Sequence, residues 1–354
     1  MPLYGSFSAR TFTFRFDART SRGRMKNRRS WFIKLVDTTA PEKAGYGECA
    51  PLPGLSIDDV PEYEEVLAGV LEKVEGQPLP GDILQNVREI VPLGFPSISF
   101  GLETALLDLQ TGGRRLIFDN NFVRGTPIPI NGLVWMADRS SMLNQVGELV
   151  AKGFSCIKIK VGGLDFEVEC DMLREIRHKY DRDTITLRLD ANGAFDDNNA
   201  LSRLEALSAF SVHSIEQPVK PGSKQLAEIC RRSPVPIALD EELIGNEVSK
   251  RQLLETIRPS FIVLKPSLHG GIYHCRDWIN VAGQLGIGWW ITSALESSIG
   301  LNAISQFTGQ YTPEIPQGLG TGSIYTDNIQ SPLRVLNGSL QYDPQGKWEP
   351  DLQV

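Results

Sequence analysis

The chain has 354 residues, of which 41% are hydrophobic and 22% charged, and its formal net charge is −7. This length suits one large domain plus a smaller one, and the negative charge argues against a nucleic-acid partner. No apolar run approaches the roughly 18 residues that a membrane-spanning helix needs. The start, MPLYGSFSARTFTF, lacks the continuous apolar core of a secretory signal. We therefore expect a cytoplasmic protein with no membrane partner.

The first part of the chain, residues 1–125, is predicted to be a small α+β domain. Residues 9–50 contain three segments with period-two apolar spacing or β-rich composition, which predict a three-stranded antiparallel meander. Amphipathic stretches at 58–75 and 99–110 predict two helices, the second stopped by a Gly-Gly pair. The sequence GYGE at 45–48 is expected to be a turn where this capping domain meets the mouth of the barrel that follows, with glycines that serve backbone geometry.

A repeat of strands and helices begins near Ile128. Short apolar runs rich in β-branched residues alternate with amphipathic stretches, and the polar residues that end successive runs are 24 to 30 positions apart. This spacing is about the length of one strand-plus-helix unit. Eight runs predict a closed barrel over residues 126–320: IPINGLVW, CIKIKV, TLRLDAN, SIEQPV, PIALDE, FIVLKPS, GWWITSAL and a weak QGLGT. In the tail, residues 321–354, Asn337-Gly338 predicts a type I′ hairpin, and the tail is expected to rejoin the first domain.

The cysteines and histidines form no metal or redox motif. The five cysteines are widely spaced without a Cys-x-x-Cys pair, which favours buried free thiols. The four histidines include no His-Glu-x-x-His pair, so we expect them to be structural or at the surface. Any metal ion should then be bound by oxygen.

Polar residues interrupt the ends of five of the apolar runs, where the active sites of such barrels lie. One such residue could simply be solvated or salt-bridged, but five together favour a functional site. The candidates are Lys158 and Lys160, Asp190 with Asn192, Glu216, Asp240 with Glu241, and Lys265 with Ser267.

The spacing of these residues predicts their chemistry. Lys158 and Lys160 are two apart, so both point into the barrel mouth. Each ammonium raises the cost of protonating the other, which should lower at least one of the two pKa values toward the range where a neutral amine can act as a base. Asp190, Glu216 and Asp240 would converge from three consecutive strands, which like charges tolerate only around a cation. Oxygen-only ligation favours Mg²⁺ over zinc.

As a set, five motifs resemble the muconate-lactonising subgroup of the enolase superfamily: KIK at 158–160, DAN at 190–192, EQP at 216–218, DEE at 240–242 and LKPS at 264–267. The resemblance covers nearly the whole chain. It implies a modified (β/α)7β TIM barrel of the α/β class, with an α+β capping domain formed from the N-terminal segment and the C-terminal tail. It also implies the superfamily's general chemistry, in which a Lys or His base works with Mg²⁺ on an enediolate.

The same resemblance implies a role for each candidate. Asp190, Glu216 and Asp240 would bind Mg²⁺, for which Mn²⁺ can substitute. Lys160 would be the acid/base lysine, and Lys265 the lysine on the opposite face of a small carboxylate substrate. The remaining assignments are to substrate binding: Lys158, which would also tune Lys160, Asn192, and Ser293 at the seventh strand.

Segments at 130–135, 238–245, 293–306 and 316–328 resemble the o-succinylbenzoate synthase family within this subgroup. That resemblance implies dehydration of 2-succinyl-6-hydroxy-2,4-cyclohexadiene-1-carboxylate to o-succinylbenzoate in menaquinone biosynthesis. A homo-oligomer is compatible with it.

Two features have alternative interpretations. Glu242 replaces the small residue of many subgroup members, and is either a surface residue after a turn or a partner of a lysine. The basic segment 21–29 is either a solvated hairpin loop or the mobile lid that the family has at this place.

Other activities are possible on the same scaffold, and particular residues distinguish them. An N-acylamino acid racemase or a dipeptide epimerase would use Lys160 and Lys265 as opposed acid and base. Dipeptide epimerases resembling this family carry an Asp-x-Asp near the eighth strand, which QGLGTG lacks, whereas racemisation stays open as a side activity. A mandelate-racemase-like dehydratase would need a histidine where Lys265 stands. A barrel without catalysis would be expected to lack a ligand or a lysine, and none is missing.

Overall fold

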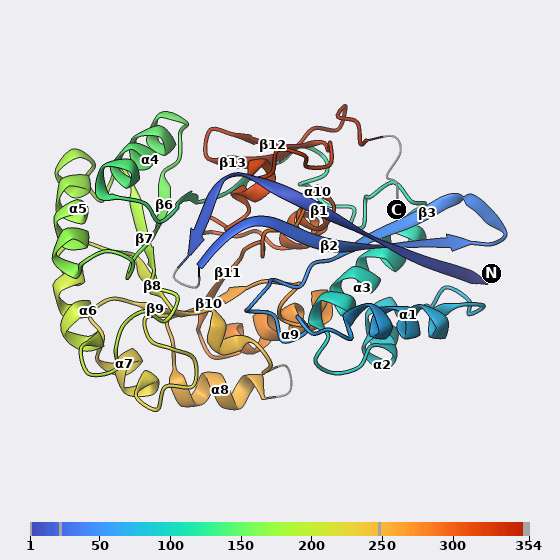
Figure 1. Ribbon diagram of the computed structural model, residues 1–354, viewed down its shortest axis with the longest axis horizontal. Helices are drawn as coiled ribbons and strands as arrows, with labels where there is room; N and C mark the ends of the chain where they lie inside the picture. Colours follow the sequence, from blue (N-terminus) through green and yellow to red (C-terminus); the bar gives the residue numbers. More distant parts are fainter. Residues whose placement is uncertain (1, 21–22, 247–248, 350–354) are drawn as a thin grey trace.

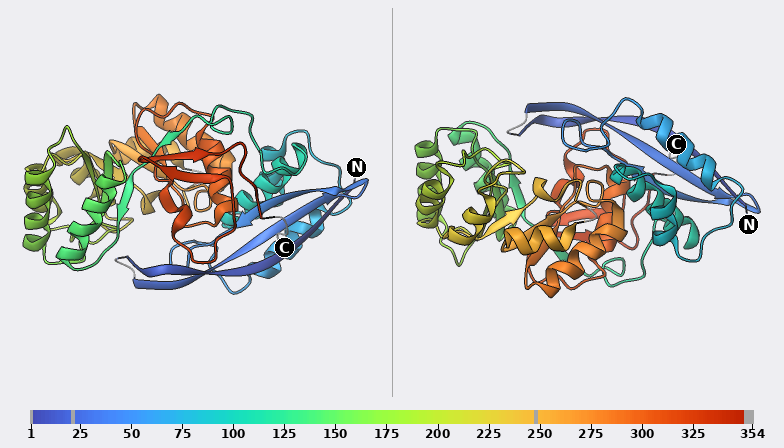
Figure 2. Two further views of the ribbon diagram at one scale, coloured as in Figure 1. Left: turned by 90° about the horizontal axis from the view of Figure 1, so that it is seen from above. Right: turned by 90° about the horizontal axis from the view of Figure 1, so that it is seen from below.

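The computed structural model describes residues 2–20, 23–246 and 249–349. Its N-terminal segment forms an antiparallel sheet of three strands: β1 (Leu3–Thr20), β2 (Gly23–Asp37) and β3 (Ala40–Cys49). This confirms the predicted meander. The β1–β2 hairpin is long, and its far end extends away from the neighbouring helices and across the barrel (Figures 1 and 2).

Three helices pack on this sheet: α1 (Tyr63–Val74), α2 (Ile83–Ile90) and α3 (Pro96–Gln110). The short α2 was not predicted, because eight residues give little periodic signal. The sequence GYGE lies inside β3, so its prediction as a turn was wrong. Its glycines instead allow β3 to approach α3: a Cβ on Gly47 would lie 1.8 Å from the carbonyl oxygen of Gly101, and one on Gly45 would lie 2.1 Å from that of Ala105.

Seven parallel strands form the barrel wall in consecutive order, and helices cover their outer side (Figure 1). The strands are β5 (Gly132–Val134), β6 (Cys156–Lys160), β7 (Thr186–Asp190), β8 (Ser214–Glu216), β9 (Ile237–Leu239), β10 (Phe261–Leu264) and β11 (Gly288–Ile291). The helices are α4 (Arg139–Ala151), α5 (Phe166–Lys179), α6 (Ala200–Ser208), α7 (Leu226–Arg232), α8 (Lys250–Ile257), α9 (Gly271–Gln284) and α10 (Ser298–Thr308), with short 3₁₀ turns η1 (Glu241–Leu243) and η2 (Gly320–Ser323).

The eighth run closes the barrel through a short seam instead of a full strand. Gln317 and Gly318 form isolated parallel bridges to Ile130 and Thr292, and so connect the first and last parts of the wall. The Gln317 side chain strengthens the join, because its Oε1 accepts the N–H of Ile291 at 2.8 Å. The sequence signal of this run was weak because so little of it pairs.

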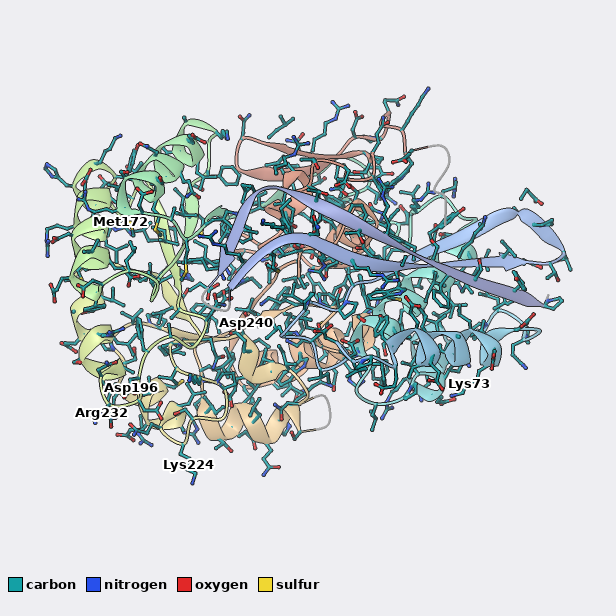
Figure 3. All side chains as sticks on the ribbon, viewed as in Figure 1. Lys73, Met172, Asp196, Lys224, Arg232 and Asp240 are labelled. Atoms are coloured by element: carbon teal, nitrogen blue, oxygen red, sulfur yellow. The ribbon has the colours of Figure 1, made fainter. Side chains whose placement is uncertain are left out.

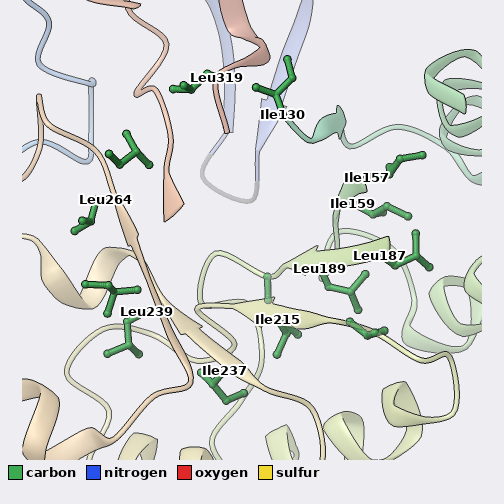
Figure 4. Packing of buried hydrophobic residues seen from close by; sticks show 14 of the residues in the cluster. Ile130, Ile157, Ile159, Leu187, Leu189, Ile215, Ile237, Leu239, Leu264 and Leu319 are labelled. Atoms are coloured by element: carbon green, nitrogen blue, oxygen red, sulfur yellow. The ribbon is translucent and has the colours of Figure 1, made fainter. Parts of the chain in front are cut away.

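Alternation along the strands separates the core from the site. Ile157, Ile159, Leu187 and Leu189 belong to a large apolar cluster (Figure 4). The residues between them in sequence, such as Lys158, point to the other side of the wall, into the barrel. Each inner strand therefore contributes both to the apolar core and to the polar interior.

In the tail, β12 (Leu333–Leu336) and β13 (Ser339–Tyr342) form a hairpin at Asn337-Gly338, and both turn residues have positive φ, as a type I′ turn requires. β13 pairs with β4 (Ile128–Pro129), which comes just before the first barrel strand β5. Before the hairpin, the segment around Tyr325 bridges to Phe14 of β1. The tail thus contacts both parts of the molecule, and the domain limits at 125 and 320 stay a proposal.

Two other predictions concern the whole chain. All five cysteines are free and four of them are buried, which confirms that expectation. Among the helices in the described ranges, none has the length and apolar character needed to cross a bilayer.

Candidate active site

The charged residues predicted from the strand ends come together at the carboxyl end of the barrel. Figure 3 places Asp240 in the middle of the molecule and Lys224 at its outer edge. The side chains of Asp190, Glu216 and Asp240 are fully buried or nearly so. Lys158, Lys160 and Lys265 are each 8% exposed. Such burial of six charged groups is stable only if they compensate one another.

Lys158 lies between two of the carboxylates. Its Nζ is 2.9 Å from Oδ2 of Asp190 and 3.0 Å from Oε2 of Glu216. Burial opposes the charge on this lysine, but the nearby carboxylates, Asp190 first, outweigh burial and raise its pKa. The lowered pKa predicted for at least one lysine of the pair is therefore not that of Lys158, because the carboxylates of Asp190 and Glu216 lie next to its Nζ.

Lys160 is held by a carboxylate and an amide. Its Nζ is 2.6 Å from Oδ2 of Asp190 and donates to Oδ1 of Asn192 at 2.7 Å. The Nδ2 of Asn192 donates in turn to Oε1 of Glu241 at 2.9 Å. The ammonium of Lys160 therefore has a fixed position at the end of β6.

Lys265 follows β10 and forms an ion pair with Asp240. Burial lowers the pKa of Lys265, but Asp240 and other acidic neighbours outweigh it and raise the pKa overall. Its backbone N–H donates to Nδ1 of His269 at 2.9 Å. Burial lowers the pKa of His269 to about 3, so the ring is neutral and can accept this bond. His269 is thus structural, as expected for the histidines.

The three carboxylates are crowded. Burial and the charges of Asp190 and Asp240 raise the pKa of Glu216 to about 8. Asp240 keeps a buried Oδ1 without a hydrogen-bond partner. Uncompensated carboxylate oxygen of this kind suits a hard cation. However, no three acidic, His or Cys side chains within residues 2–20, 23–246 and 249–349 lie close enough together to hold an ion. Lys158 lies between Asp190 and Glu216 instead.

Gln217 is a site residue that the sequence interpretation overlooked. Its Oε1 accepts the backbone N–H groups of Asp240 and Glu242, each at 3.2 Å, and it has a left-handed φ of 38°. It therefore fixes the chain after β9.

Glu242 matches neither alternative proposed for it: it is half-buried, and accepts the N–H of Gly222 at 3.0 Å without contact to a lysine in the described chain. It ties the loop after β8 to the loop after β9.

Two predicted hydroxyl residues are engaged within the protein. Ser293 is buried after β11, and its Oγ lies 2.5 Å from Oγ1 of Thr321. Ser267 donates to Glu296.

A cavity of about 1040 Å³ opens beside the charged cluster, lined by loops that follow β5 to β9 and by Leu55. Asn192 and Glu241 belong to its wall, whereas Ser293 is not among the described residues that line it.

A second buried charged group, which we call the interface cluster, consists of Arg28, Glu48 and Glu296. Arg28 on β2 donates to the carbonyl oxygens of Ala50 and Ala294. It is 1% exposed, so neither a solvated loop nor a lid describes this residue. Residues 21 and 22 of the basic segment lie outside the described residues. The cluster fastens the capping sheet to the barrel loop after β11.

Glu48 of the interface cluster caps helix α10. It accepts the N–H and Oγ–H of Ser297, at 2.9 and 2.6 Å, and the N–H of Gly300 at 2.9 Å. A carboxylate is stabilised at a helix start by the unpaired N–H groups there. The sequence analysis placed residues 45–48 where the capping domain meets the barrel mouth, but it gave Glu48 itself no role.

Comparison with known proteins agrees with this architecture. Residues 141–346 match the family model described as enolase C-terminal domain-like. The o-succinylbenzoate synthase of Desulfotalea psychrophila is 41% identical, over 95% of this chain and 98% of that protein. The crystal structure of MenC from the same organism has a TM-score of 0.86 at 38% identity, and the match covers 96% of this chain and 100% of that one. The L-Ala-D/L-Glu epimerase of Bacillus subtilis has a TM-score of 0.85 over 98% of both chains, but at 18% identity it shows only the fold.

The chain therefore belongs to the enolase superfamily and, within it, to the o-succinylbenzoate synthase family. This confirms the predicted family and the fold class of a modified barrel with a capping domain.

Proposed function

We propose that this chain catalyses the dehydration of 2-succinyl-6-hydroxy-2,4-cyclohexadiene-1-carboxylate to o-succinylbenzoate in menaquinone biosynthesis. The observation that carries the proposal is the pair of buried lysines, Lys160 and Lys265, each held by a different aspartate at the carboxyl end of the barrel. The 41% identity to a synthase of this name over almost the whole chain supports it.

In this proposal Lys160 moves the proton. As a neutral amine it takes the proton from the carbon that bears the ring carboxylate. The resulting ammonium then gives a proton to the hydroxyl group on the adjacent carbon, which leaves as water from the same face. A base positioned in this way contributes about 10²- to 10⁴-fold in rate. The contacts of Lys160 with Asp190 and Asn192 keep Nζ in place for both transfers.

Lys265 stabilises charge instead of moving the proton. Its pKa is raised by Asp240 and other acidic neighbours, so it stays an ammonium at neutral pH. A fixed positive charge near the carboxylate stabilises the negative charge that develops there when the proton leaves. Lys158, whose pKa is also raised, adds a second fixed charge close by.

Asp190, Glu216 and Asp240 are proposed to hold Mg²⁺. Support comes from the unpartnered Oδ1 of Asp240 and from the crowding that raises the pKa of Glu216. Holding the ion requires the carboxylates to exchange contacts with Lys158 for contacts with the cation. The chemistry that bound Mg²⁺ supplies is polarisation of the substrate carboxylate, worth several kcal/mol.

The test is an ultraviolet assay of the purified protein with Mg²⁺ and the cyclohexadiene substrate, beside Lys160→Ala and beside excess EDTA. Dehydration by the wild type that is lost in both controls supports the lysine and metal assignments together. If the wild type does not dehydrate the substrate, but exchanges the α-proton of N-acylamino acids or dipeptides in D₂O through Lys160, the protein is a racemase or an epimerase instead.

A further inference from the structure

Glu241 is a buried carboxylate to which the mechanism above gives no role. It begins η1 directly after Asp240, is 6% exposed, and lies on the wall of the cavity. Carboxylates are rarely so buried unless they are paired. Its Oε1 accepts a hydrogen bond from Nδ2 of Asn192 at 2.9 Å.

Asn192 connects this carboxylate to the proposed base. Its Oδ1 accepts from Nζ of Lys160 at 2.7 Å, while its backbone N–H donates to Oδ1 of Asp190 at 3.1 Å. Its φ of 44° lies in the left-handed region, which Asn adopts more readily than most other residues that carry a side chain. The side chain is thus held between Lys160 and Glu241.

The two ends of the Asn192 amide are not interchangeable here. Lys160 offers only N–H donors to the amide, both as an ammonium and as a neutral amine whose lone pair faces the substrate, so it must meet the amide oxygen. An ionised carboxylate can only accept, so it must meet the amide NH₂ group. With the amide turned over, two NH groups would face each other at Lys160 and two oxygens at Glu241. Glu241 therefore selects the orientation that presents Oδ1 to Lys160.

We infer that Glu241 is a positioning residue that acts through Asn192 to hold Nζ of Lys160 in place. The inference rests on the proposed function, since that function makes Lys160 the proton carrier. A second route has to be separated from it. The charge of Glu241 also helps to raise the pKa of Lys265, so replacing Glu241 could act on that lysine without involving Asn192.

A double-mutant cycle separates the two routes. Glu241→Ala is expected to lower kcat about tenfold with little change in KM, a loss of transition-state positioning rather than of binding. Asn192→Ala should lower kcat at least as much, and the double variant should be no slower than Asn192→Ala alone. Glu241→Gln should keep most of the activity, because its Oε1 can still accept from Asn192. If the losses of kcat in the two single variants multiply in the double variant, or if Glu241→Ala changes only KM, the inference is overturned.

A second measurement does not depend on turnover. Competitive acetylation with acetic anhydride, read by peptide mass spectrometry, reports how freely Nζ of Lys160 reacts, with the exposed Lys224 as internal reference. Lys160 should be acetylated faster in Glu241→Ala than in the wild type. In Asn192→Ala and in the double variant it should be acetylated at the same rate as in Glu241→Ala. Glu242→Gln is the matched control, because Glu242 contacts Gly222 and Gln217 and should leave Lys160 unchanged.

The two measurements keep the inference and the proposed function apart. If the wild type does not dehydrate the substrate but labelling follows the expected pattern, the proposed function fails and the positioning of Lys160 by Glu241 stands. If the wild type is active and Glu241→Ala leaves both kcat and the labelling of Lys160 unchanged, the inference fails and the function stands.

Discussion

The barrel mouth and the interface cluster both bury charge, but they satisfy it differently. At the mouth, the main partners of Asp190, Glu216 and Asp240 are lysine side chains, and Asp190 also accepts the backbone N–H of Asn192. At the interface, Glu48 accepts backbone N–H groups of the barrel, and Arg28 donates to the backbone carbonyls of Ala294 in the barrel and Ala50 in its own domain. Side-chain partners can be exchanged for a substrate or an ion, whereas backbone partners are fixed by the fold.

This difference indicates what each cluster does. A carboxylate that faces a movable ammonium can change partner during a reaction, at the cost of burying several charges. A carboxylate at a helix start holds two elements in register and gains nothing from changing partner. Loss of a charge should therefore affect turnover at the mouth and folding at the interface.

The largest expected effect is on turnover at the mouth. Lys160→Ala should lower kcat by about 10²- to 10⁴-fold, because it removes the proposed base. The melting temperature should change little, since Asp190 keeps Lys158 as a partner. Steady-state kinetics and circular dichroism melting measure the two. A variant that loses activity only because it unfolds would contradict the comparison.

The next effect is on stability at the interface. Glu48→Ala leaves the donors of Ser297 and Gly300 without their acceptor and should reduce the free energy of unfolding by about 2–4 kcal/mol. Glu48→Gln, which keeps an acceptor oxygen, should lose less. Urea unfolding followed by tryptophan fluorescence gives both values. Equal stability of Glu48→Ala and wild type would show that the cap of α10 is dispensable.

Arg28→Met should have a similar but smaller effect, about 1–3 kcal/mol, because it leaves two buried carbonyl oxygens unpaired while filling much of the same volume. The matched control is Arg29→Met, since Arg29 is exposed and its ion pair with Glu64 is largely solvated. If both variants melt at the same temperature, burial of Arg28 does not fasten the capping sheet.

The last prediction is a pH dependence of stability that comes from Glu103. Burial raises the pKa of Glu103 to about 8, although the N–H groups of Ile272 and Tyr273 at the start of α9 favour its ionised form. The folded protein therefore binds this proton more tightly than the unfolded chain, so the contribution of Glu103 to stability falls as pH rises from about 4.5 to about 8. Glu103→Gln should flatten this part of the stability profile, measured by thermal melts between pH 5 and 9. An unchanged slope would contradict the assignment.

The mouth could be predicted from the sequence because its residues end regular strands. Each of Lys160, Asp190 and Glu216 closes an apolar run, so the period of two and the repeat length place them together. The interface cluster could not be predicted in this way. Glu48 and Ser297 are 249 positions apart and meet only when the capping sheet docks on the barrel. The contact expected between residues 45–48 and the barrel mouth named no partner for Glu48.

Prediction also failed where side-chain partners decide the outcome. The strand alternation placed Lys158 correctly, but its pKa depends on which carboxylates its Nζ reaches, and these come from β7 and β8. Glu242 and Gln217 were misjudged or missed for the same reason, because their contacts join two loops whose approach the sequence does not encode locally.

The short seam at Gln317 and Gly318 gives the barrel a preferred place to open. Strands β6 and β7 pair over five residues, whereas the seam joins the wall through single bridges on each side. Local opening costs least where few backbone hydrogen bonds must break. Amide protons of residues 317 and 318 should therefore exchange with deuterium before those of β6 and β7. The barrel wall then opens locally at the seam while the charged mouth stays intact.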